Sequence, residues 1–243
     1  METKEIIGRN PVLEYLRSLE GNEGAELFIA RNAHGKIIDT IASLARGKNI
    51  HITYCEKSVL ARVDSSSRHQ GVMLRLRSAG TKAEPADLLS RAAADRGVIV
   101  LLDQLTDPHN VGSIIRSAEA LGATGVALAE SHAAGLTPTV VKSSAGATAY
   151  MDILSVSNVA QFLDRARDAG FWTIGASTAG ESALERLREL RPAVVVIGAE
   201  GSGMRRLTAE KCDMLVRIPL RGNIESLNAS VAAGIILYEI LKD

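Results

Sequence analysis

The chain has 243 residues, of which 46% are apolar, so it can form one large domain or two smaller ones with a proper core. Lys and Arg number 28, as do Asp and Glu, so net charge alone indicates no nucleic-acid partner. The distant Cys55 and Cys212 indicate neither a disulfide framework nor a metal cluster. With no signal-peptide pattern and no apolar run of transmembrane length, we expect a soluble cytoplasmic protein.

Residues 1–78 predict a small α/β domain, because short helical and strand patterns alternate there. We expect a helix from Asn10-Pro11 to Leu19, helices at 36–45 and 57–63, and strands at 26–30, 51–55 and 71–76. This part holds 12 Lys and Arg against 9 Asp and Glu, a small excess that weakly favours contact with a polyanion. Its candidate phosphate contacts, each of which also suits a solvated surface, are Arg9, Arg31, Arg62, Arg68, Arg75 and Arg77.

His69 precedes the last of these strands, in the sequence His-Gln-Gly. It could contact RNA, but an ordinary turn residue is the favoured interpretation. The following stretch 78–86 carries Gly and Pro without periodic apolar residues, so we place a linker and a domain boundary there.

The rest of the chain predicts a second α/β domain with a parallel sheet. A helix at 87–95 is followed by strands at 97–102, 125–129, 152–156, 171–175 and 193–198, and by helices at 111–121, 140–146, 159–169 and from Thr208. The strands are nearly continuous apolar runs, as expected where helices cover both faces of a parallel sheet.

The C-terminal segment combines a strand, a polar loop and a helix. We expect a strand at 214–220, a loop at 221–228 and a helix at 229–241, with Ser226 or Asn228 as its N-cap. Four hydrogen-bonding side chains lie close together in the loop, which favours a ligand site over an ordinary capped helix start. They are Asn223, Glu225, Ser226 and Asn228.

Three loops, at 103–110, 198–203 and 221–228, each follow a buried strand. Ligands of open parallel sheets bind beyond the carboxyl ends of the strands, so these loops are expected to form one site. The glycines at 198, 201 and 203 match neither a Rossmann fingerprint nor a P-loop. Glu200 stands among apolar neighbours, although a surface turn would also explain it. For Arg116 alone, a salt bridge on a solvated helix face is the simpler interpretation.

Three motifs change these interpretations. Asp107–Gly122, Val196–Met204 and Ile218–Gly234 resemble, in order and spacing, the three signatures of the SpoU (TrmH) family of RNA ribose 2′-O-methyltransferases. The N-terminal part is similar to the RNA-binding domain, related to a ribosomal protein, that precedes the catalytic domain in the branch acting on bacterial 23S rRNA.

The resemblance implies an α/β SPOUT knot domain, in which a parallel sheet carries a deep trefoil knot. The implied organisation is a substrate-binding domain at 1–77, a linker at 78–87 and a catalytic domain at 88–243, in a homodimer. The implied cofactor is S-adenosylmethionine, without a metal, held by the backbone around Gly198, Ile218 and Leu227. The implied catalytic residues are Asn110, Arg116, Glu200, Ser226 and Asn228.

The implied reaction is attack of a ribose 2′-hydroxyl on the sulfonium methyl group. A guanidinium stays protonated, so we expect Arg116 to stabilise the developing alkoxide and bind the adjacent phosphate rather than act as a base. Glu200 is expected to pair with Arg116, and Asn110 and Asn228 to orient Arg116 or the ribose. The expected target is 23S rRNA, by resemblance the guanosine of the peptidyl-transferase P loop. The alternatives are another rRNA or tRNA nucleotide, or a non-catalytic rRNA-binding assembly protein.

Overall fold

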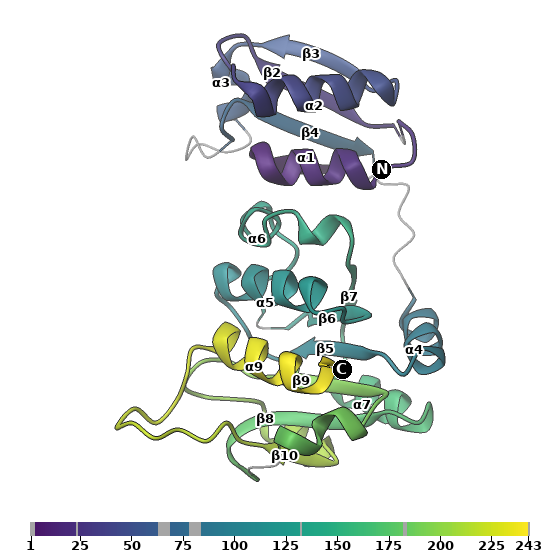
Figure 1. The fold of residues 1–243 in the computed structure, drawn as a ribbon, viewed down its shortest axis with the longest axis vertical. Coiled ribbons are helices and arrows are strands. Elements are labelled where there is room, and N and C mark those ends of the chain that lie inside the picture. Colours follow the sequence, from purple (N-terminus) through teal and green to yellow (C-terminus); the bar gives the residue numbers. More distant parts are fainter. Residues whose placement is uncertain are drawn as a thin grey trace. The chain divides into compact units, whose positions relative to one another are not determined.

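The computed structural model describes residues 3–22, 24–62, 69–77, 84–131, 133–181 and 184–242. The chain forms two compact units, shown in Figure 1. Unit 1 comprises Met1–Thr81 and Pro138–Tyr150, and unit 2 comprises Lys82–Thr137 and Met151–Asp243. Arg68 and residues 78–83 of the expected linker lie outside the described residues.

Unit 1 contains a four-stranded mixed sheet in the order β1-β4-β2-β3. Its strands are β1 (Thr3–Ile7), β2 (Glu26–Ala30), β3 (His51–Cys55) and β4 (Val72–Arg77). Strand β4 pairs antiparallel with β1 and β2, whereas β2 and β3 are parallel. The three strands expected in this part are therefore present, and β1 is an additional edge strand.

Helices cover both faces of the unit 1 sheet. They are α1 (Arg9–Ser18), α2 (Lys36–Gly47), α3 (Lys57–Ala61), α6 (Pro138–Ser143) and the 3-10 helix η1 (Ala147–Ala149). Leu16 of α1 and Ile41 of α2 pack with Leu27 and Leu74 on one face of the sheet. Leu60 of α3 belongs to a smaller cluster with Phe28 and Met73. Because side chains alternate along a strand, β2 contributes to both clusters.

The segment Pro138–Tyr150 belongs to unit 1, although the sequence pattern does not separate it from the second domain. The hydroxyl of Tyr15 donates to the carbonyl oxygen of Thr148 at 3.0 Å. The hydroxyl of Tyr150 donates to Glu14 Oε2 at 2.7 Å. These contacts attach a late segment of the chain to helix α1.

Unit 2 contains a six-stranded sheet in the order β10-β8-β9-β5-β6-β7, with every pair parallel. Its strands are β5 (Val98–Leu102), β6 (Gly125–Ala129), β7 (Asp152–Val156), β8 (Trp172–Glu181), β9 (Ala193–Ile197) and β10 (Met214–Val216). The expected parallel sheet is confirmed. The central strands β5, β6 and β9 are completely buried, which explains their unbroken apolar sequences.

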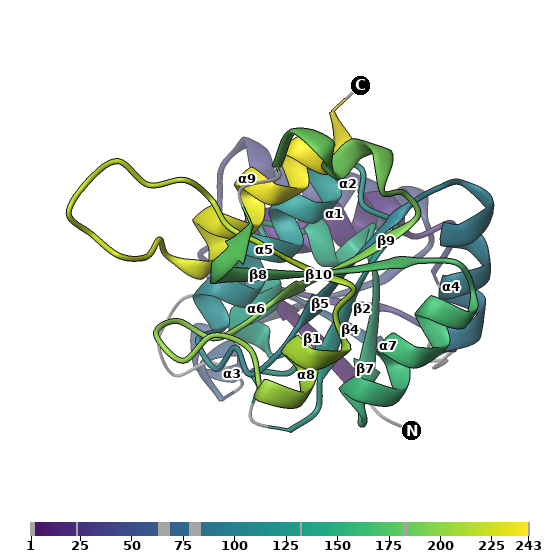
Figure 2. The ribbon, with the colours of Figure 1, turned by 90° about the horizontal axis from the view of Figure 1, so that it is seen from below.

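Two layers of helices cover this sheet. They are α4 (Pro85–Ala94), α5 (Pro108–Ala120), α7 (Val159–Asp168), α8 (Arg206–Lys211), α9 (Ala229–Leu241) and the 3-10 helix η2 (Leu184–Glu189). Ile99 and Leu101 of β5 pack with α4 and α7. Helices α5 and α9 contact each other on the opposite face, as Figure 2 shows. Within the described ranges, none of the helices has the length and apolar character that a membrane crossing requires.

The strand expected at 214–220 is wrong in its length. Strand β10 ends at Val216, and its pairing with β8 is shifted between Leu215 and Val216. Pro219 has no N–H to donate to a ladder, and Leu220 is exposed, so this segment leaves the sheet. The chain between β10 and α9 then forms a projecting loop, visible in Figure 2.

Candidate active site

The side chain of Glu200 joins three segments that are far apart in the sequence. Its Oε1 accepts a hydrogen bond of 3.0 Å from Nδ2 of Asn110 and another from Nδ2 of Asn228. The backbone N–H of Ala229 donates to the same oxygen at 3.2 Å. The two asparagines also contact each other, because Asn228 Nδ2 lies 2.9 Å from Asn110 Oδ1. The structure therefore brings together the segments that follow β5, β9 and β10 in the chain, as the sequence predicts.

Asn110 reaches Glu200 from the first turn of α5. The loop expected at 103–110 ends earlier, because α5 begins at Pro108 with Asp107 as its N-cap. Oδ1 of Asp107 accepts from the N–H of His109 at 2.9 Å, and proline suits the first helical position. The helix, not a loop, thus fixes Asn110, whose side chain is buried.

Asn228 reaches Glu200 from the start of α9. It is the N-cap of this helix, and its Oδ1 accepts from the N–H groups of Ser230 at 2.9 Å and Val231 at 3.3 Å. One side chain thus caps the helix with its oxygen and contacts the carboxylate with its nitrogen. Of the two N-cap candidates, the structure selects Asn228 over Ser226.

The loop after β9 is shaped by its glycines. Ala199 and Gly203 exchange two backbone hydrogen bonds of 2.9 Å, which closes the loop. Gly201 and Gly203 have φ values of 78° and 69°, in the left-handed region that favours glycine. At Gly198, a Cβ atom would lie 2.3 Å from the carbonyl carbon of Gly203. No side chain fits at position 198 unless the loop moves.

A cavity of about 460 Å³ lies beside this loop, within the range of small-molecule sites. Most of its lining comes from the middle of β8 at 176–178, the loop after β9, and the chain between β10 and α9. Helices α8 and α9 complete it with Ala209, Ala229, Ala232 and Ile236. Its lining includes five of the candidate residues, namely Gly198, Glu200, Ile218, Ser226 and Leu227. The same wall carries the carboxylate of Glu225 and the guanidinium of Arg217.

Arg116 differs from the other candidates. It lies on α5 and is exposed, and it is not part of the cavity lining. Among the described residues, its guanidinium makes neither an ion pair nor a side-chain hydrogen bond. The expected pairing of Glu200 with Arg116 is therefore wrong in this structure, where Oε1 of Glu200 accepts from the two asparagines instead.

Two features of the site were not predicted. Asp103 is completely buried after β5, and its carboxylate accepts from Arg205 Nε at 2.8 Å and from the Arg205 N–H at 3.0 Å. This pair fastens the chain after the β9 loop to the end of β5. The second feature is that Ala176–Thr178 line the cavity, although no sequence motif marks this segment. Asp103 could have been identified from the sequence, because it is a charged residue directly after the apolar run 97–102.

Two family models match the chain. Residues 97–238 match the model described as the SpoU rRNA Methylase family. Residues 6–81 match the model described as RNA 2′-O ribose methyltransferase substrate binding.

Similar proteins and structures agree with these matches. YacO of Bacillus subtilis (strain 168), which is named as a TrmH family tRNA/rRNA methyltransferase, is 36% identical over 239 residues, covering 98% of this chain and 94% of YacO. The SpoU methyltransferase AviRb of Streptomyces viridochromogenes superposes with a TM-score of 0.79 at 26% identity, covering 99% of this chain and 89% of AviRb. AviRb in complex with the cofactor AdoMet gives a TM-score of 0.76 at 25% identity with the same coverage. The α/β knot fold class expected from the motifs is thereby confirmed.

Proposed function

Because the chain belongs to the SpoU rRNA methylase family, we propose that it transfers a methyl group from S-adenosylmethionine to a ribose 2′-hydroxyl of RNA. The observation that carries this proposal is the convergence of the three motif segments. Asn110, Glu200 and Asn228, one from each segment, contact one another beside a single cavity.

The size of the cavity and the charges in its lining suit S-adenosylmethionine. The backbone at Gly198 forms a wall without a side chain, where a flat adenine can approach closely. Ile218 and Leu227 supply apolar surface and backbone groups, which can read a purine edge. The sulfonium and ammonium charges suit the carboxylate of Glu225, and the methionine carboxylate suits Arg217. We assign cofactor binding to Gly198, Ile218 and Leu227.

The protein's part in the reaction is positioning and charge stabilisation. When bound, S-adenosylmethionine supplies a methyl group already activated by the neighbouring sulfonium charge. We assign to Arg116 the stabilisation of the developing 2′-alkoxide and contact with the adjacent phosphate. Its exposed guanidinium, with no ion pair among the described residues, is available for a phosphate. Ser226 lines the cavity and is assigned to orient the ribose.

We assign to Glu200 the positioning of the two asparagines and the start of α9, rather than an ion pair with Arg116. Its carboxylate holds Asn110 and Asn228 and accepts from the first N–H of α9. These contacts fix the helix start that borders the cavity. Preorganised polar groups cost no rearrangement at the moment of reaction, which is the advantage of such a network.

We propose 23S rRNA as the substrate, as in the RlmB-like branch, with the guanosine of the peptidyl-transferase P loop as the target. The match of residues 6–81 to the substrate-binding model supports recognition of RNA by this part. Another nucleotide of rRNA or tRNA is the second candidate, because YacO is named for both RNA classes. We also propose a division of the chain into a binding domain at 1–77, a linker at 78–87 and a catalytic domain at 88–243. The location proposed for the protein is the cytoplasm, where the substrate lies.

We also propose a homodimer that buries the outer face of α9. Val231 and Tyr238 are 50% and 56% exposed, and they lie seven residues apart on one face of this helix. Large apolar side chains exposed together on one helix favour a protein partner.

The proposed function is tested with purified protein, S-adenosylmethionine and unmodified transcripts. We expect calorimetry to detect saturable binding of S-adenosylmethionine, and tritiated methyl groups to enter a 23S rRNA transcript. A tRNA transcript under the same conditions distinguishes the two substrate candidates. Saturable cofactor binding without labelling of any RNA would support a non-catalytic role instead.

A further inference from the structure

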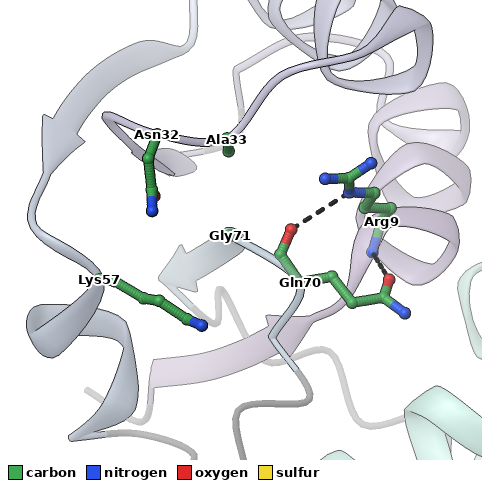
Figure 3. Close-up of a pocket in the computed structure, with 6 residues that line it drawn as sticks. All are labelled: Arg9, Asn32, Ala33, Lys57, Gln70 and Gly71. Carbon is green, nitrogen blue, oxygen red and sulfur yellow. Dashed lines mark hydrogen bonds between the residues drawn. The ribbon is translucent and has the colours of Figure 1, made fainter.

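Unit 1 has a hollow of its own, with a volume of about 430 Å³. Figure 3 shows the residues around it, which come from the start of α1, the turn after β2, the start of α3 and the turn before β4. The lining consists of Arg9, Asn32, Ala33, Lys57, Gln70 and Gly71. Two cations and two amides thus surround one space, and none of the described residues that line it is a carboxylate.

The turn before β4 has an unusual backbone. Gln70 and Gly71 have φ values of 52° and 80°, so two consecutive residues are left-handed. A Cβ atom at Gly71 would lie 2.7 Å from the Cβ of Ala33, so only glycine allows this close approach. The ring of His69, completely buried, accepts at Nδ1 from the N–H of Gly71 at 3.0 Å. His69 therefore supports the turn, and the turn shapes the hollow.

Arg9 is held in place by the same turn. Its Nε donates to the carbonyl oxygen of Gln70 at 3.2 Å, and its backbone N–H donates to Gln70 Oε1 at 3.1 Å. Both contacts are drawn in Figure 3. The terminal nitrogens of Arg9 and the amide nitrogen of Gln70 make no hydrogen bond within the described part of the chain. The guanidinium is thus oriented without being neutralised.

Some other arginines of this unit have carboxylate partners, although Arg46 and Arg62 have none among the described residues. Arg17 pairs with Glu14 at 2.8 Å, and Arg75 pairs with Glu5 at 3.0 Å. In contrast, neither Arg9 nor Lys57 forms an ion pair among the described residues. Among the described residues, the hollow therefore combines two positive charges without an ion pair, the amide of Asn32 and the amide nitrogen of Gln70.

We propose that this hollow binds one unpaired nucleotide of the RNA substrate, and the proposal rests on the proposed function. Arg9 and Lys57 contact the phosphates on either side of the nucleotide. Asn32 offers both a donor and an acceptor to the edge of its base, and Gln70 donates to the base from its amide nitrogen. Proteins read RNA sequence mainly where bases are unpaired and can leave the strand, which suits a hollow better than a flat basic surface.

The test compares two lysines that each begin a helix. Lys57 begins α3 and lines the hollow, whereas Lys36 begins α2, is exposed and lies outside the hollow. K57Q and K36Q remove the same charge, and neither side chain has an ion pair among the described residues. Fluorescence anisotropy of the full chain with a short single-stranded RNA of mixed sequence, and with its duplex, measures affinity at several salt concentrations.

We expect K57Q to weaken single-strand binding about fivefold and to lower the salt slope by about 0.7, the loss of one phosphate contact. K36Q should stay within about twofold of wild type. N32A should weaken single-strand binding with an unchanged salt slope, because it removes a base contact and no charge. Binding of S-adenosylmethionine, measured by calorimetry, should be unchanged in all three variants.

Equal effects of K57Q and K36Q would overturn the proposal, since the hollow would then be ordinary surface charge. The proposal would also be overturned if K57Q lost equal affinity for single-stranded and duplex RNA. A polyglutamate peptide that displaces the RNA by binding that depends on Lys57 would overturn it as well. If K57Q weakens single-strand binding more than K36Q does although the wild-type protein methylates no RNA, the proposal for the hollow is supported and the proposed function fails. If wild type methylates RNA and K57Q binds and methylates equally well, the hollow alone fails.

Discussion

Asn110 and Glu200 lie 90 positions apart in the chain, yet Nδ2 of Asn110 donates a 3.0 Å hydrogen bond to Oε1 of Glu200. The same oxygen accepts from Asn228 and from the N–H of Ala229. One carboxylate oxygen therefore connects α5, the loop after β9 and the start of α9.

The variant E200Q should reduce methyl transfer about tenfold, because hydrogen bonds to a charged acceptor are roughly twice as strong as neutral ones. The replacement keeps the size of the side chain but places an N–H₂ group where one oxygen stood. Initial rates of tritium incorporation measure the effect. E210Q is the matched control, because Glu210 is exposed on α8 and pairs with the exposed Arg206. Similar methyl-transfer rates for E200Q and E210Q would show that Glu200 does not contribute to the active site.

The variant G198A should weaken binding of S-adenosylmethionine by about a hundredfold or more, as the β9 loop moves to admit the new methyl group. The added Cβ would lie 2.3 Å from the backbone of Gly203 and Met204. G222A is the control from the neighbouring loop, where a Cβ meets nothing within 4 Å. Calorimetry measures affinity, and thermal unfolding shows whether each variant is folded. Wild-type affinity in folded G198A would contradict the proposed cavity wall.

The variant R116A should lower the rate of methyl transfer about a hundredfold while cofactor affinity stays unchanged, because Arg116 does not line the cavity. R116K should recover part of the activity, since lysine restores the charge without the bidentate geometry. R165A is the control, because Arg165 is also exposed on a helix of unit 2. A rate for R116A within a few-fold of wild type would show that Arg116 does not act on the transition state.

The variant V231D should convert the proposed dimer into a monomer, because a carboxylate would be buried on the outer face of α9. In one chain Val231 is 50% exposed, so the fold itself should tolerate the change. Light scattering after gel filtration measures the mass. L207D serves as control, because Leu207 is 56% exposed on α8. A wild-type monomer at micromolar concentration, or a dimer of V231D, would contradict this interface.

Much of the fold could be predicted from local patterns. Unbroken apolar runs such as Ala193–Ile197 predict buried parallel strands, and Asn228 before a run of apolar residues predicts a helix start. The length of β10 was overestimated because the apolar residues Ile218 and Leu220 line the cavity instead of packing in the sheet. Apolar character alone does not distinguish these two uses.

The site was predicted as a set of residues but not as a set of contacts. Motif spacing brings Asn110, Glu200 and Asn228 into one group, yet which of them pairs with which depends on tertiary distances. The expected ion pair of Arg116 with Glu200 follows from charge alone, whereas the structure satisfies Glu200 with neutral amides. The attachment of Pro138–Tyr150 to unit 1 has no local signal either, since Tyr15 and Thr148 are 133 positions apart.

The position of the transferred methyl group tests the central claim most directly. A 23S rRNA transcript labelled with tritiated methyl groups by the full chain is digested completely with alkali, and the products are separated by charge. A methylated 2′-oxygen cannot attack its neighbouring phosphate, so we predict that the tritium is recovered in alkali-resistant dinucleotides. Tritium recovered only in mononucleotides would place the methyl group on a base and contradict ribose 2′-O-methylation.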